Sequence, residues 1–186
     1  MKDFLLISSI NAITYKEFFP LLKEGKARGG YTFNKTLMFD TPEGEKSGPN
    51  IAWFTSLPTP DKRKMILTKK YHHKLYPHYD NYRAIEVSRI KDIPYDYECV
   101  MAVPITIFQY DLDNILVKID EQPERPLRKK IVIMGMAAGN SAVNGFGSQV
   151  GYTNHKNDRG GCAVVNGKLK FARVCIILAR RKKVLK

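Results

Sequence analysis

The apolar run FLLISSI, Phe4 to Ile10, constrains the fold more than any other stretch of the chain. Only Ser8 and Ser9 interrupt it. A run this apolar is typical of a strand buried on both faces, as in a parallel sheet. Parallel strands are joined by long crossovers, so each needs neighbours from elsewhere in the fold. The run therefore predicts a strand inside an α/β sheet, and it raises the question of which strands lie beside it.

The segment ITYKEFFPLLKEG, residues 13–25, predicts a helix, because its apolar residues gather on one side and its charged residues on the other. Thr14 and Glu17 have the T-x-x-E spacing of a capping box. Gly25 is a natural C-terminal stop. Pro20 lies inside the pattern, where it predicts a kink or a break.

The rest of the chain predicts mainly strands. ARGGYTF and IAWFTSL are strand candidates separated by the polar turn TPEGEKSGPN, which makes the first 60 residues half of an open α/β sheet. Beyond them the texture is β-rich. AIEVSRI predicts a half-exposed strand, the charged segment 111–130 with its two prolines predicts a mobile connection, and Asn166-Gly167 predicts a type I′ hairpin turn. We expect two parts, 1–60 and 61–186.

The positive charge is concentrated rather than spread evenly. The formal net charge is +13, and residues 131–186 hold ten basic side chains and one acidic one. A second cluster lies in DKRKMILTKKYHHK. A localised basic excess is the electrostatic footprint of a nucleic-acid binder, although the ending ARRKKVLK alone is also consistent with a solubilising tail.

Composition excludes several other classes. No stretch reaches 18 apolar residues, and the first run lacks the basic flank and cleavage site of a signal peptide, so a cytoplasmic protein is expected. The three cysteines are scattered, which is typical of free thiols. The four histidines lack the spacing of a metal site, so no metal is expected. GMAAGNS follows a strand but lacks the ending of a P-loop.

The stretch PHYDNYRAIEV combines tyrosines with Asn81 and Arg83. Aromatic rings stack on bases, Asn pairs with adenine through two hydrogen bonds, and Arg binds guanine or phosphate. A tyrosine-rich packing loop explains the same composition equally well. Both interpretations stay open at this point.

Several ordered segments together resemble one family. INAITYKEFFPLLKEGK, NIAWFTSL and YPHYDNYRAIEVSRIKDIPYDYECVMAVPITIF, followed by IVIMGMAAGN and DRGGCAVVNGKLKFARV, are similar to the EcoRI-type adenine-specific DNA methyltransferases. The resemblance runs over nearly the whole chain. It implies a Rossmann-like sheet that binds S-adenosylmethionine, and an Asn-Pro-Pro-Phe/Tyr tetrapeptide that holds an adenine extruded from duplex DNA.

This sequence contains neither the tetrapeptide nor a Gly-rich cofactor loop followed by an acidic strand end. The resemblance then implies that FLLISSI corresponds to the strand after the catalytic motif. We expect an α/β fold in which residues 1–60 are the last strands of the catalytic sheet and residues 61–186 are a β-rich DNA-recognition lobe. The expected origin is a truncated frame, an enzyme split in two, or a decayed gene.

The resemblance and the residue chemistry together give the expected sites. No catalytic or cofactor-binding residue is expected, apart from Asn11 as a residue of the catalytic pocket, at the end of the first strand. The expected contacts to double-stranded DNA are Tyr79, Asn81, Tyr82 and Arg83, then Asn140, Ser141 and Arg159, and the basic cluster Lys62, Arg63, Lys64, Lys69 and Lys70. Lys168, Lys170 and Arg173 are expected to extend this track.

The expected function is methyl transfer to the 6-amino group of adenine in duplex DNA by the intact enzyme, with this chain alone inactive. Two alternatives remain. One is a non-catalytic specificity subunit that works with a separately encoded N-terminal half. The other is an inactive remnant.

Overall fold

The computed structural model describes residues 3–30, 37–48, 50–58, 62–119, 127–137, 150–157, 162–170 and 172–180. The chain divides into two compact units, residues 1–62 and 63–186. Among the described residues it is mostly β-sheet with few helices, and its large sheet is mixed, which is consistent with the α/β class expected. No helix in the described ranges is long and apolar enough to cross a membrane.

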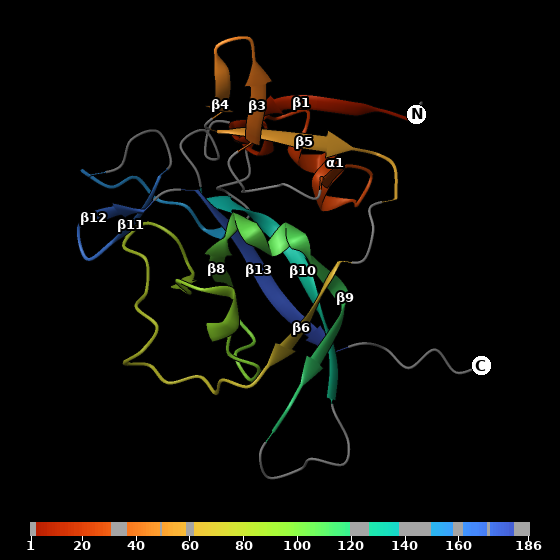
Figure 1. Ribbon diagram of the computed structural model, residues 1–186. Coiled ribbons are helices and arrows are strands. Elements are labelled where there is room, and N and C mark those ends of the chain that lie inside the picture. The colour runs from red at the N-terminus through yellow and green to blue at the C-terminus, as the bar shows by residue number, and fades with distance from the viewer. Residues whose placement is uncertain are drawn as a thin grey trace. The chain divides into compact units, whose positions relative to one another are not determined.

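The first unit contains a three-stranded sheet of order β1-β5-β2 and a separate hairpin, β3-β4 (Figure 1). Its elements are β1 (Leu5–Ser9), η1 (Ile10–Thr14), α1 (Phe19–Lys23), β2 (Arg28–Gly29), β3 (Leu37–Thr41), β4 (Gly44–Gly48) and β5 (Ile51–Thr55). Phe19 and Phe54 are fully buried, and the ring of Phe18 meets that of Phe54 edge to face with centroids 4.9 Å apart. These aromatic contacts form the core of the unit.

The first strand differs from the prediction. FLLISSI does form β1, but β1 pairs antiparallel with β5 and lies at an edge of its sheet. The side chain of Leu5 is 61% exposed, and Leu6 and Ile7 are exposed as well. The prediction of a parallel strand buried on both faces is therefore wrong, because an apolar run specifies extended backbone without specifying its partners.

The predicted helix over residues 13–25 is also broken into pieces. Thr14 ends the 3₁₀ helix η1, and its hydroxyl donates to the carbonyl of Asn11 at 2.8 Å, so it does not cap α1. Pro20 lies in the first turn of α1, where a missing N–H costs nothing. Gly25, with φ of +70°, ends the helix as predicted.

The segment predicted as one polar turn contains strand β4 within the β3-β4 hairpin. All of β4 except Gly48 is exposed, so it carries no apolar alternation by which the sequence could have announced a strand. Phe39 packs close to Gly48 across the pair, where a Cβ would lie 2.5 Å from the ring. Strand IAWFTSL is confirmed as β5.

The second unit is built on a six-stranded sheet of order β6-β9-β10-β13-β8-β7. The outer pairs β6-β9 and β7-β8 are parallel, and the inner pairs are antiparallel. Figure 1 shows the long strands β10 and β13 side by side in this unit. The elements are β6 (Arg63–Leu67), β7 (Ile85–Glu86), η2 (Ile90–Asp92), β8 (Met101–Pro104), η3 (Ile105–Gln109), β9 (Tyr110–Val117), β10 (Leu127–Ala137), β11 (Ala163–Val165), β12 (Lys168–Lys170) and β13 (Arg173–Arg180).

Two predictions for this unit have clear outcomes. Asn166 and Gly167 both have positive φ, +50° and +72°, which confirms a type I′ turn between β11 and β12. The charged segment 111–130 is not one mobile connection, because it forms β9 and the start of β10 on either side of residues 120–126, which lie outside the described part.

The core of this sheet generates a stability prediction. Ile115 on β9 is fully buried, whereas Ile66 on the neighbouring strand β6 is 45% exposed. We expect Ile115→Ala to lower the free energy of unfolding by about 2–5 kcal/mol, because it leaves a cavity. The matched change Ile66→Ala should cost about 1 kcal/mol or less. Urea unfolding of both variants checks this, and equal losses would contradict the assigned burial.

Candidate nucleic-acid interface

The segment of residues 77–86, which ends with the two residues of β7, folds back on itself. The backbone N–H of Tyr79 donates to the carbonyl of Ala84 at 3.0 Å, and that of Glu86 donates to the carbonyl of Pro77 at 2.8 Å. His78 and Ile85 form an isolated antiparallel bridge between the two arms. These bonds give the tip of the tyrosine loop, residues 79–84, a defined conformation. The sequence of the tip has no helical period, and the tip does not form a helix.

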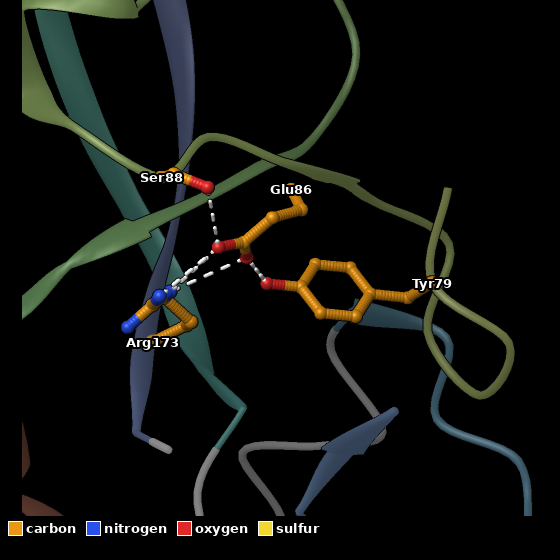
Figure 2. Close-up of polar contacts among 4 residues, drawn as sticks. All are labelled: Tyr79, Glu86, Ser88 and Arg173. Atoms are coloured by element: carbon orange, nitrogen blue, oxygen red, sulfur yellow. Dashed lines mark hydrogen bonds and ion pairs between the residues drawn. The ribbon is translucent and has the colours of Figure 1, made fainter. Parts of the chain in front are cut away.

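A buried carboxylate fastens the loop to the sheet. Glu86 accepts a hydrogen bond from the Tyr79 hydroxyl and forms an ion pair with Arg173 on β13, with Nη2 and Oε1 3.0 Å apart. Nε of Arg173 also donates to both carboxylate oxygens, at 3.2 and 3.3 Å, and the Ser88 hydroxyl lies 3.4 Å from Oε1. Figure 2 shows the carboxylate between the guanidinium and the phenol. The Glu86 side chain is only 2% exposed.

The electrostatics of this group favour a structural role. Burial, and then the charge of Glu86, raise the pKa of the Tyr79 hydroxyl, so it stays protonated and donates. Burial alone would lower the pKa of Arg173, but its hydrogen bonds to Glu86 and the charge of that carboxylate raise it overall. Burial raises the pKa of the nearby Cys175 thiol to about 12, which keeps it protonated and unreactive. Glu86, Arg173 and Tyr79 therefore stabilise one another, and none of them, nor Cys175, is a nucleophile here.

The amide of Asn81 fastens the tip of the loop to the β11-β12 hairpin. Its Nδ2 donates to the carbonyl of Cys162 at 2.7 Å, and its Oδ1 accepts from the N–H of Val164 at 2.8 Å. The amide thus pairs with the backbone as a strand residue would. Asp80 adds two bonds, from its N–H to the carbonyl of Val164 and from the N–H of Gly167 to its carboxylate, each 2.8 Å long.

Three of the predicted DNA contacts are therefore turned inward. Tyr79, Asn81 and Tyr82 are 6%, 1% and 4% exposed, and both rings belong to a core cluster with Ala163, Val165 and Cys175. These three side chains pack inside the unit, as the interpretation of this stretch as a tyrosine-rich packing loop would have it. Arg173, expected on a surface track, is held by Glu86 instead.

Arg83 is the predicted DNA contact of the loop that is exposed to solvent. Its N–H donates to the carbonyl of Val150 at 3.2 Å, and its aliphatic stem lies against Gly151. A Cβ at Gly151 would come within 2.7 Å of Cγ of Arg83, and Gly151 has φ of +68°. No feature of the sequence predicts this contact. Only glycine fits there, so it sets the direction of an exposed guanidinium.

The remaining predicted residues belong to other elements or lie outside the described part. Lys62, Arg63, Lys64, Lys69 and Lys70 are exposed; Lys62 ends the first unit, and the other four lie on or just after β6. Asn11 is exposed in η1. Asn140, Ser141 and Arg159 lie outside the described residues.

An open groove with a volume of about 370 Å³ lies in the second unit. It is bounded by the start of β6, the residues around η2, and the connection from β8 through η3 to β9. Its cations are Arg63, Arg89 and Lys91. Of these, only Arg63 is a DNA contact predicted from the sequence. Across the described ranges, no cluster of His, Cys, Asp or Glu suits a metal ion.

Comparisons with known proteins place these features in a family. The family model described as "Adenine-specific methyltransferase EcoRI" matches residues 1–48 and 43–182. The type II methyltransferase M.EcoRI of Escherichia coli is 37% identical over 147 residues, covering 65% of this chain and 45% of the relative. The type II methyltransferases M.MgeORF184P of Mycoplasma genitalium and M.MpnI of Mycoplasma pneumoniae are 33% and 32% identical, each covering 56% of this chain and 40% of the relative.

The chain thus spans less than half the length of the curated relatives it matches. No solved structure matches it.

The buried ion pair generates a second stability prediction. Arg173→Met leaves the Glu86 carboxylate buried without its cation, so we expect a loss of about 3–5 kcal/mol in the free energy of unfolding. The matched change Arg89→Met removes an exposed pair with Asp92 and should cost about 1 kcal/mol or less. Chemical denaturation of both variants measures the difference. Similar small losses would show that Glu86 does not depend on Arg173.

Proposed function

The chain belongs to the family of EcoRI adenine-specific methyltransferases, and we propose that it is the C-terminal, DNA-binding portion of such an enzyme. The whole enzyme would transfer a methyl group from S-adenosylmethionine to the 6-amino group of adenine at a specific site in duplex DNA. The observation that carries this proposal is the family match, which extends over both units of the chain.

In this proposal residues 1–60 supply the last strands of a Rossmann-like catalytic sheet, and residues 61–186 form the DNA-recognition lobe. The exposed apolar strand β1, at an edge of its sheet, supports the first assignment, because such an edge can accept further strands. The basic excess of the C-terminal third supports the second. Asn11 follows β1 directly and would face the pocket of the complete enzyme.

The groove of the second unit does not fit S-adenosylmethionine. The cofactor carries a positive sulfonium and an ammonium group, whereas the groove of the second unit is lined by three cations and no carboxylate. We derive no catalytic step within this chain. Since its 186 residues also contain no Asn-Pro-Pro-Phe/Tyr tetrapeptide, we expect no methyl transfer by the purified chain alone.

The tyrosine loop would contribute to DNA binding through Arg83. The DNA backbone would be bound by the exposed basic cluster, Lys62, Arg63, Lys64, Lys69 and Lys70. Tyr79, Asn81 and Tyr82 would act indirectly, because their buried contacts fix the loop that carries this guanidinium. Asn140, Ser141 and Arg159 remain proposed contacts. The segments that follow them in the chain, at Val150 and at Cys162, are hydrogen-bonded to the loop.

The salt dependence of duplex binding tests the proposal. We expect the chain to bind a fluorescent DNA duplex with an affinity that falls steeply as salt rises, by roughly 10³–10⁵ between about 50 and 200 mM if six to ten phosphates are contacted. Fluorescence anisotropy at several salt concentrations measures the slope. Absence of binding at low salt, or a flat dependence, would contradict a DNA-binding lobe.

Arg83 supplies a more local test. Arg83→Gln should weaken duplex binding by about 1–3 kcal/mol, whereas the matched surface change Arg128→Gln on β10 should leave it close to wild type. Gly151→Ala should reproduce part of the Arg83→Gln loss, because the added Cβ displaces the stem of Arg83. Anisotropy titrations check all three variants. If Arg83→Gln and Arg128→Gln behave alike, the loop does not contact DNA.

A polypeptide that supplies the N-terminal half of the enzyme is the partner that we propose. Co-expression with a polypeptide that carries the tetrapeptide and the cofactor loop should restore methyl transfer from radiolabelled S-adenosylmethionine to duplex DNA. Restored activity would make this chain the specificity subunit of a split enzyme. If the chain binds DNA and activity is not restored, it acts as a DNA-binding module alone.

A further inference from the structure

The open groove of the second unit gathers three basic side chains from two separate places in the chain. Arg63 begins β6 and is the register partner of Tyr110 on the parallel strand β9. Arg89 and Lys91 flank Ile90 at the start of η2. The fold therefore brings these cations together. Because Arg63 is far from Arg89 and Lys91 in the sequence, the three do not form a local basic cluster there.

The cations of the groove are not neutralised from within it. Among the described residues, none of the side chains that line the groove is a carboxylate, and neither Arg63 nor Lys91 has an acidic partner. Arg89 forms an ion pair with Asp92 through Nε alone, at 2.6 Å. This leaves both terminal nitrogens of the guanidinium as donors and restrains its orientation.

The rest of the lining is suited to oxygen acceptors. Ser88, Thr106 and Tyr110, whose side chains carry hydroxyls, line the same groove as the cations. Hydroxyls, guanidinium groups and ammonium groups are the usual protein partners of phosphate oxygens. The groove is open rather than enclosed, so it suits a chain of phosphates that passes across it better than a small molecule sealed inside it.

We infer that this groove binds phosphates of the DNA backbone through Arg63, Arg89 and Lys91. The inference rests on the proposed function, and it adds Arg89 and Lys91, with the hydroxyls beside them, to the DNA-binding surface. Because phosphates are the same in every sequence, the groove sets the position and affinity of the protein on DNA without reading bases.

The test compares two double variants of equal charge. Arg63→Gln with Lys91→Gln removes two cations of the groove, and Lys118→Gln with Lys130→Gln removes two exposed cations that do not line it. Both variants lower the net charge by the same amount, so a general electrostatic effect alters them equally. Duplex binding is measured by fluorescence anisotropy over a series of salt concentrations, on two duplexes of unrelated sequence.

The groove variant should bind with a salt slope smaller by about 2, and roughly 10- to 30-fold more weakly near 0.15 M salt, to the same degree on both duplexes. The control variant should keep the wild-type slope. If wild type binds with a steep slope and the two variants are indistinguishable, the groove is not the site although the proposed function stands. If wild type does not bind duplex DNA at all, the proposed function and this inference both fail. Matching circular dichroism melts establish that each variant is folded.

Discussion

The buried carboxylate of Glu86 is the group on which the organisation of the second unit depends. A carboxylate that is taken out of water costs several kcal/mol unless a cation and hydrogen-bond donors surround it. Here the cation, Arg173, comes from a strand 87 residues further along the chain, and the donor, Tyr79, comes from the preceding loop. The carboxylate of Glu86 thus joins the tyrosine loop to the central sheet, through Tyr79 on one side and Arg173 on the other.

From this anchor the polar contacts extend outward to the surface. Asn81 and Asp80 bind the loop to the β11-β12 hairpin, and the backbone of Arg83 binds the segment at Val150. The buried members determine the shape of the loop, and the side chain of Arg83 is exposed. The groove formed by β6, η2 and η3 adds three more cations to the same unit. A rigid interior that presents fixed cations suits a protein whose partner is a polyanion.

The sequence predicted those features that local chemistry determines. Asn166 and Gly167 favour positive φ and adopt it, and the apolar run IAWFTSL forms the strand β5. The sequence did not predict features that depend on contacts between residues far apart in the chain. The tyrosines of PHYDNYRAIEV have the composition of a base-stacking surface. The sequence does not reveal that Glu86, the partner of the Tyr79 hydroxyl, is buried against the distant Arg173, or that Asn81 bonds to Cys162. For the same reason β1 could be identified as a strand while its antiparallel pairing with β5 could not.

Hydrogen exchange of the chain with and without duplex DNA locates the DNA-binding surface, because it reports on every backbone amide without altering a side chain. We expect DNA to slow exchange in residues 62–70 and 83–91, which carry exposed cations, and in residues 104–110 along the groove. We expect little change in β10, whose amides are already bonded to β13 and β9. Protection confined to residues 3–30 and 37–58, or no protection at a DNA concentration that saturates binding, would contradict the proposed DNA-binding lobe.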